Sequence, residues 1–318
     1  MTNRSKNANV KSSLLHEMVN IACASQELAG METTVEKELL HYDIMAALSQ
    51  SGLLTKLTFQ GGTCLRMAYG SQRLSEDLDF VGGVDFSPED YQDLAQVLIA
   101  YFEPRYGLNI RVKTPKERSF SSKNVGVGRW MVAIETQPQN KNVPKQKIKV
   151  EIANIPSYTR NIKAIKLNYA SLQVKLSTVL VNCESEEEIL ADKIVALCLR
   201  KFIKARDLWD MVMLAQQGIN VNDTWVKAKF TDYQSNELPA ITLQKRINEL
   251  PKYWLSGKFE HEMRRFLPRK KLEETFEQIG FMEYFTDAIN DLLNKTIKRW
   301  TAPPLKVIKT ALNCRVGL

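Results

Sequence analysis

One stretch limits the fold of this chain more than any other. Residues 57–81, LTFQGGTCLRMAYGSQRLSEDLDFV, contain a glycine pair and one short helix between two segments that alternate as strands do. Because side chains alternate faces along a strand, Asp77 and Asp79 share one face while Leu78 and Phe80 enter the core. The sequence therefore predicts a strand–turn–helix–strand unit that holds two carboxylates side by side.

Other segments before residue 180 have equally regular patterns. A helix is predicted over residues 33–50, with Thr33 or Thr34 as its cap, and strands over 54–59, 77–81, 109–114, 129–136 and 145–155. In the last strand the apolar residues face one side, so Glu151 projects from the other side among lysines.

After residue 180 the pattern becomes helical. Ser185 with Glu188 three places later is a capping box, and two amphipathic helices follow up to residue 218. The sequence thus predicts an α+β fold: a mixed-sheet α/β domain over residues 1–180, N-terminal helices included, and an all-helical domain over residues 181–318.

The composition excludes several classes of protein. With 318 residues the chain can form two domains, and it has no apolar run long enough for a membrane span. The first twenty residues lack the apolar core of a signal peptide. The five cysteines lie far apart without a CxxC pair, which argues against a disulfide framework and a zinc site. A cytoplasmic protein is expected.

The chain has a net charge of +8, and its basic residues are concentrated in two blocks. Residues 105–149 contain eleven Lys and Arg against two acids, a balance of +9, and residues 245–271 contain nine against three, a balance of +6. Such blocks suit a polyanion, either RNA or a triphosphate, although two solvated surfaces are the alternative.

The paired carboxylates indicate a metal. At i and i+2 of a strand, Asp77 and Asp79 lie roughly 6–7 Å apart at the backbone, so one takes up a proton or a divalent cation lies between them. Oxygen ligands without His or Cys select Mg²⁺ or Mn²⁺. Glu151 from a neighbouring strand would supply a third carboxylate, enough for a two-metal phosphoryl or nucleotidyl transfer centre.

The glycine pair fits a phosphate-bearing substrate. Gly61 and Gly62 lie where a strand meets a helix, so bare backbone N–H groups can bind phosphate. Thr63 adds a hydroxyl and Arg73 a positive charge, while Ser75 either caps the local turn, which we favour, or lies near the triphosphate. The combination GGT-x13-DxD between apolar strands is far more specific than either half alone.

These residues resemble a known family. Residues 35–48, VEKELLHYDIMAAL, and 57–80 are similar to the AbiEii/AbiGii toxins of bacterial toxin–antitoxin and phage-defence (abortive infection) systems, within the DNA polymerase β-like nucleotidyltransferase superfamily. A second block, EEILADKIVALCLRKFIKARDLWDM (187–211), resembles that family's later helical motif. The resemblance covers about residues 30–215 and implies a polymerase β-like nucleotidyltransferase domain followed by helices that complete the cleft.

The resemblance also implies roles for single residues. Asp77 and Asp79 would bind metal, Gly61, Gly62 and Thr63 would lie at the triphosphate, and Lys193 and Asp207 would complete the site. It implies a Mg²⁺-dependent transfer of a nucleoside monophosphate from an NTP, GTP or CTP, to an RNA hydroxyl with release of pyrophosphate. The 3′ end of tRNA is the expected acceptor, and an antitoxin encoded nearby the expected partner.

Each assignment has a structural alternative. The aspartates could cap a turn, and Arg73 and Lys193 could be surface residues. Glu151 could pair with Lys147 or Lys149, Arg206 with Asp207, and Asp210 with an arginine. The functional alternatives are nucleotidylation of a protein hydroxyl, nucleotide binding without transfer, and modification of an antibiotic, although the basic surface suits a cationic aminoglycoside poorly.

Overall fold

A seven-stranded mixed sheet forms the first half of the molecule. The computed structural model describes residues 14–24, 28–115, 125–140, 142–172, 176 and 178–301. The strands, in the order β3-β4-β5-β2-β1-β7-β6, are β1 (Thr58–Gln60), β2 (Leu78–Val81), β3 (Asn109–Lys113), β4 (Val127–Glu135), β5 (Gln146–Ala153), β6 (Asn161–Ala164) and β7 (Leu180–Cys183). Strand β2 runs parallel to β5 and β1 parallel to β7, and the other neighbours are antiparallel. The predicted α+β class is confirmed.

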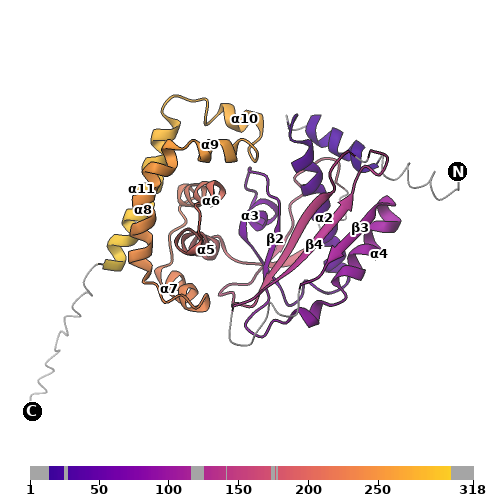
Figure 1. Ribbon diagram of the computed structural model, residues 1–318, viewed down its shortest axis with the longest axis horizontal. Coiled ribbons are helices and arrows are strands. Elements are labelled where there is room, and N and C mark those ends of the chain that lie inside the picture. The colour runs from indigo at the N-terminus through magenta and orange to yellow at the C-terminus, as the bar shows by residue number, and fades with distance from the viewer. Residues whose placement is uncertain are drawn as a thin grey trace, which may run out of the picture.

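One face of the sheet is packed against helices. The alternate residues Ile148 and Val150 of β5 are fully buried, in one core with Leu39 and Phe102. Leu39 belongs to α2 (Glu32–Gln50) and Phe102 to α4 (Leu94–Tyr106), two helices on the side of the sheet away from the C-terminal helices (Figure 1). This burial provides the hydrophobic stabilisation that holds the strands in register.

The strand–turn–helix–strand unit lies at the centre of the sheet. After β1 come α3 (Gly61–Cys64) and a π-helical turn over Leu65–Tyr69, which ends at Gly70 with φ of 85°. Strands β1 and β2 pair antiparallel, with Phe59 opposite Phe80 and their rings 5.0 Å apart. The prediction that the first strand begins at residue 54 was wrong, because residues 51–56 form turns.

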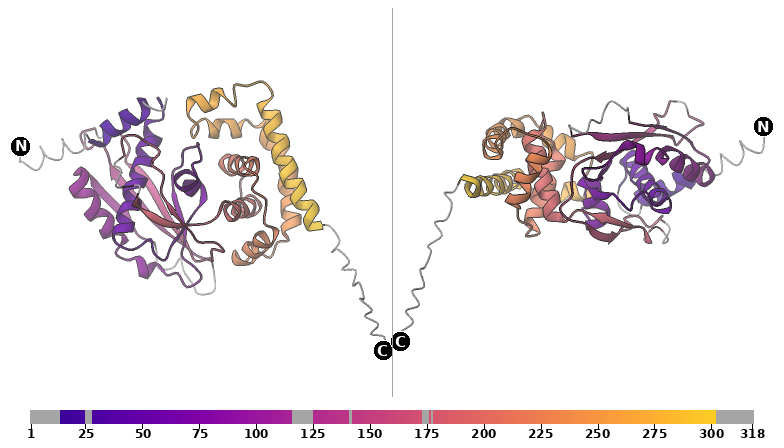
Figure 2. Two further views of the ribbon diagram at one scale, coloured as in Figure 1. Left: turned by 180° about the vertical axis from the view of Figure 1, so that it is seen from behind. Right: turned by 90° about the horizontal axis from the view of Figure 1, so that it is seen from below.

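Helices make up the second half. They are α5 (Glu186–Leu199), α6 (Ala205–Gln216), α7 (Asp223–Asp232), α8 (Pro239–Leu255), α9 (Lys258–Met263), α10 (Arg269–Glu273) and α11 (Phe281–Thr301). In Figure 1, α5 and α6 lie between the sheet and an outer layer of α8 and α11, and the back view in Figure 2 shows the same layers. A further helix covers residues 14–24, and a 3₁₀ turn covers Pro88–Tyr91. Over the described ranges, none of the helices combines the length and apolarity needed to span a bilayer.

The helix caps were predicted with mixed success. Ser185 precedes α5, and its hydroxyl accepts the backbone N–H of Glu188 at 3.2 Å, which confirms the predicted cap. The reciprocal half of the predicted capping box was wrong, because the Ser185 N–H donates to Thr159 Oγ1 and the Glu188 carboxylate accepts from the N–H groups of Tyr158 and Thr159. The cap predicted for α2 was wrong, because this helix follows Met31 without a side-chain cap. Strand β7 continues the sheet past residue 180, and the division into domains at that position stays a prediction.

Candidate active site

A cavity of about 380 Å³ opens between the centre of the sheet and helices α5 and α6. Its size suits a small molecule, since ligand pockets typically measure about 300–1,000 Å³. The lining combines apolar side chains such as Phe80, Val127 and Tyr233 with predicted site residues from five separate elements, namely Gly61, Gly62, Asp79, Glu151, Lys193 and Asp207.

Two of the predicted carboxylates lie in one row across the sheet. Asp79 of β2 is the register partner of Glu151 on the parallel strand β5, and Glu151 is in turn opposite Arg129 of β4. Adjacent strands are about 4.8 Å apart, so both carboxylates face the same cavity from neighbouring backbones. Glu151 forms an ion pair with Arg129 and not with Lys147 or Lys149, the structural alternative that the sequence left open.

The electrostatics of this row favour a cation. Burial, followed by the charges of Glu151 and Asp77, raises the pKa of Asp79 to about 7. Burial is the main cause of this shift, and the two neighbouring carboxylates add to it more than Lys193 and Arg200 offset. The donors are carboxylate oxygens, which suit Mg²⁺ or Mn²⁺. Asp79 and Glu151, with Asp77 beside them, therefore fit a divalent metal.

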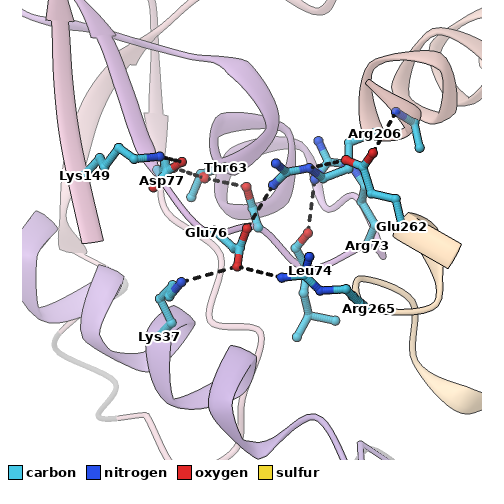
Figure 3. Close-up of polar contacts among 12 residues, drawn as sticks. Lys37, Thr63, Arg73, Leu74, Glu76, Asp77, Lys149, Arg206, Glu262 and Arg265 are labelled. Carbon is cyan, nitrogen blue, oxygen red and sulfur yellow. Dashed lines mark hydrogen bonds and ion pairs between the residues drawn. The ribbon is translucent and has the colours of Figure 1, made fainter. Parts of the chain in front are cut away.

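Asp77 lies just before β2 and has different contacts. Its carboxylate forms an ion pair with Lys149 of β5, whose Nζ lies 3.0 Å from Oδ2 (Figure 3). The hydroxyl of Thr63 lies within hydrogen-bond distance of the Asp77 carbonyl and 2.7 Å from Ser75 Oγ. Thr63 and Ser75 are both buried. These bonds fasten the start of β2 to the helix after the glycine turn.

The glycine pair is required by two close approaches. Gly61 has φ of +75°, and a Cβ there would lie 3.1 Å from Asp79 Oδ2. A Cβ on Gly62 would lie 2.2 Å from Arg73 Nη2, closer than atoms can pack. The turn therefore lies directly against the Asp79 carboxylate on one side and the Arg73 guanidinium on the other.

A chain of alternating charges connects this turn to the helical half. Arg73 donates from Nε and Nη2 to the two oxygens of Asp210, at 2.6 and 2.5 Å. Lys193 Nζ lies 2.9 Å from Asp210 Oδ2 and 2.7 Å from Asp207 Oδ1, and Arg200 pairs with the second oxygen of Asp207. Three cations and two anions leave one net positive charge.

The pKa values in this chain follow its pairing. Burial by itself would lower the pKa of Lys193, but Asp207 and Asp210 outweigh burial and raise it. Burial would likewise raise the pKa of each aspartate, yet Lys193 with Arg200 lowers that of Asp207, and Arg73 with Lys193 lowers that of Asp210. Both carboxylates are therefore ionised and hold the ammonium of Lys193 at the wall of the cavity.

Four predicted site residues do not line this cavity: Thr63, Arg73, Ser75 and Asp77. The polar atoms of the first three are bound inside the protein, whereas the partly exposed carboxylate of Asp77 is bound by Lys149. The contact of all four with metal or nucleotide stays a prediction. Arg206, which could have paired with Asp207, instead pairs with Glu76 and Glu262 (Figure 3).

A buried cluster around Lys229 is absent from the predictions. The fully buried ammonium of Lys229 lies 3.6 Å from Glu184, 3.0 Å from Glu188 and 2.8 Å from Asp192. Within the described part of the chain, these three acids are the group close enough together to hold a metal, but a lysine already compensates them. Glu184 lies just before the N-cap residue Ser185, and Glu188 and Asp192 lie one turn apart on α5, so their spacing of four residues was the available signal. The cluster packs α7 against α5 beside the cavity, where Asp192 forms part of the wall.

Comparison with known proteins decides the family. The profile described as "Nucleotidyl transferase AbiEii toxin, Type IV TA system" matches residues 43–292. The chain belongs to the AbiEii family. This member is thus a nucleotidyltransferase toxin of a type IV toxin–antitoxin system, which confirms the family and the enzyme class expected from the sequence.

One solved structure shows the same fold, and a second is similar at a lower score. MenT4, a nucleotidyltransferase toxin from Mycobacterium tuberculosis, is similar with a TM-score of 0.52 and 14% identity, over 90% of this chain and 92% of that one. JHP933 from Helicobacter pylori has a TM-score of 0.48 and 20% identity, over 84% and 92% of the two chains. No curated protein matches this AbiEii chain.

Proposed function

We propose that this AbiEii protein uses Mg²⁺ to transfer a nucleoside monophosphate from an NTP to a hydroxyl of an RNA acceptor, with the 3′ end of tRNA as the first candidate. The observation that carries the proposal is the row of Asp79 and Glu151, which opens into the same cavity as Gly61 and Lys193. A carboxylate pair, a close-approach turn and a fixed ammonium are the parts that nucleotidyl transfer needs.

The proposed reaction is an exchange of bonds at the α-phosphorus. The acceptor oxygen attacks this phosphorus, the bond to the oxygen that bridges to the β-phosphate breaks, and pyrophosphate leaves while the hydroxyl proton is released. Metal ions held by Asp79, Glu151 and Asp77 would activate the attacking oxygen and stabilise the leaving one.

The chain's own cations would hold the triphosphate. Lys193 and Arg200 both lie at the cavity wall, and Asp207 binds both of them and fixes their positions. The glycine turn leaves room for phosphate oxygens next to Asp79, because no side chain fills that space. Asp207 and Asp210 therefore act as positioning residues, whereas Lys193 and Arg200 would touch the nucleotide.

Labelled nucleotide tests the proposal. The protein is incubated with Mg²⁺, total tRNA and each α-labelled NTP in turn, with GTP and CTP first. We expect label at the RNA 3′ end in the native protein and in Asp85→Asn, which changes an exposed aspartate outside the cavity, and none in Asp79→Asn. Label in protein instead of RNA would contradict the proposal that RNA is the acceptor. Label in neither would contradict nucleotidyl transfer itself. A cytoplasmic location and a neighbouring antitoxin gene belong to the same proposal.

A further inference from the structure

The basic residues of the first block gather on one face of the sheet. The register of β3, β4 and β5 aligns them in two rows, each with a cation at both ends and an apolar residue in the middle: Lys113–Met131–Lys149 and Arg111–Ala133–Lys147. The intervening residues of the same strands point to the opposite face, where Ile110, Trp130 and Ile148 are buried. Strand alternation therefore separates the cations from the core.

This face is open and its charge is largely uncompensated. Arg111, Lys113 and Lys147 are exposed, and none of them has an acidic partner among the residues that the structure describes. Lys149 is the exception, because it binds Asp77. Residues 116–124 and Lys141, which also belong to the basic block, lie outside the described residues.

The two rows continue directly into the carboxylate row. Arg129, Met131 and Ala133 follow one another on the same face of β4, and Arg129 is level with Glu151 and Asp79. At about 3.3 Å per residue, the two cation rows lie roughly 7 and 13 Å from the carboxylate row. The lines of cations on β3 and β5 are two strands, or about 10 Å, apart.

We propose that this face binds the 3′-terminal strand of the acceptor RNA and leads its end to Glu151 and Asp79. The backbone phosphates lie between the cations of β3 and β5, and bases rest on the floor formed by Met131 and Ala133. The inference rests on the proposed function for its acceptor, but the binding surface itself follows from charge and register.

A single RNA strand fits this face better than an acidic peptide does. Its phosphates are evenly spaced, as the cations are along each strand, and its bases can use the apolar floor between the two lines. The strand must also end beside Glu151, which lines the cavity, so a free terminus is required.

Salt-dependent binding of a fluorescein-labelled single-stranded RNA dodecamer tests the surface. The variant Arg111→Gln/Lys113→Gln/Lys147→Gln removes three phosphate contacts. We expect at least a tenfold weaker Kd at about 0.1 M salt and a slope of log K against log salt that is smaller by about 2, at about 0.7 per contact. Binding of NTP and Mg²⁺ stays unchanged, which shows that the variant is folded.

The matched control removes the same charge from the helical block, as Lys245→Gln/Lys252→Gln/Lys270→Gln. These three lysines are also exposed, and we expect no change in the salt slope. Equal losses in both triples, or no loss in the sheet triple, would overturn the inference. So would a polyglutamate peptide that binds as tightly as RNA and depends on the same residues. Failure of the proposed function is distinct, because it appears as normal RNA binding by the native protein without label transfer.

Discussion

Two regions of this AbiEii protein carry an excess of positive charge and arrange it differently. In the helical block, several basic residues pair with acids one turn away on their own helices or turns: Arg246 with Glu249, Arg264 with Glu260, Arg269 with Glu273 and Lys271 with Glu274. Each block also has cations without an acidic partner among the described residues, but only in the strand block does a sheet register align them, placing Arg111, Lys113 and Lys147 in two rows on one face.

The difference teaches that secondary structure decides how a basic segment presents its charge to a polyanion. A helix brings residues three and four apart together, so acids in the same segment cancel the field of the cations. A strand sends alternate residues to opposite faces, so a segment rich in lysine and poor in acid becomes a face of one sign. The sequence balances of +9 and +6 do not separate these cases, whereas the register of the strands does.

The largest effect is expected where the strand face meets the cavity. Asp79→Asn should lower the rate of label transfer by at least about a thousandfold, because metal and charge stabilisation supply several kcal/mol. The affinity for RNA should stay the same or rise slightly, since the change removes a negative charge beside the cations. Parallel transfer and binding assays make the measurement, and a parallel fall in RNA affinity would show that docking and chemistry are not separate.

Next in size is the effect of the buried charge chain. Asp210→Ala would leave Arg73 buried without its bidentate partner, at a cost of about 3–5 kcal/mol in the free energy of unfolding. Urea denaturation measures this cost. A loss below about 1 kcal/mol would mean that the chain is no stronger than the surface pairs of the helical block.

The stability of the protein should depend on pH through Asp79, in the carboxylate row of the strand region. Without divalent cations, folded Asp79 keeps its proton up to about pH 7, whereas the unfolded carboxyl loses its own near 3.8. The group's contribution to stability is therefore complete below the unfolded pKa and is lost as the pH rises through about 7. Urea titrations in EDTA between about pH 5 and 8 should show this fall in the native protein and a flatter curve in Asp79→Asn. Identical curves would contradict the raised pKa.

The smallest effect concerns one surface pair. Glu260→Gln releases Arg264 on the helical block and should cost about 0.3–0.5 kcal/mol of stability. It should also strengthen the binding of the RNA dodecamer slightly at low salt, because an uncompensated cation appears. If RNA affinity instead rose as much as it falls in the sheet triple, the contrast between the two regions would not hold.

Much of the centre of this fold could be predicted because local rules govern it. The alternation of side chains along a strand correctly predicted that Leu78 and Phe80 are buried. It also predicted the face from which Glu151 projects, although the sequence did not show that β5 pairs with β2. Lys193, which the family resemblance places at the site, lines the cavity.

The rest depended on packing between distant segments. Arg73 reads as a surface or phosphate-binding residue until Asp210, far along the chain, binds it beneath Gly62. The partner of Glu151 was missed because register, not sequence proximity, selects Arg129. The burial of Lys229 could not be predicted, because its charge is compensated by three acids of a distant segment, residues 184–192.

Crystals soaked with Mn²⁺ and a non-hydrolysable NTP analogue test the central claim most directly, through the anomalous signal of the metal. We predict manganese between Asp79 and Glu151, with the triphosphate against Gly61 and Lys193. Manganese in the Glu184, Glu188 and Asp192 cluster instead, or a nucleotide bound away from this cavity, would contradict the account.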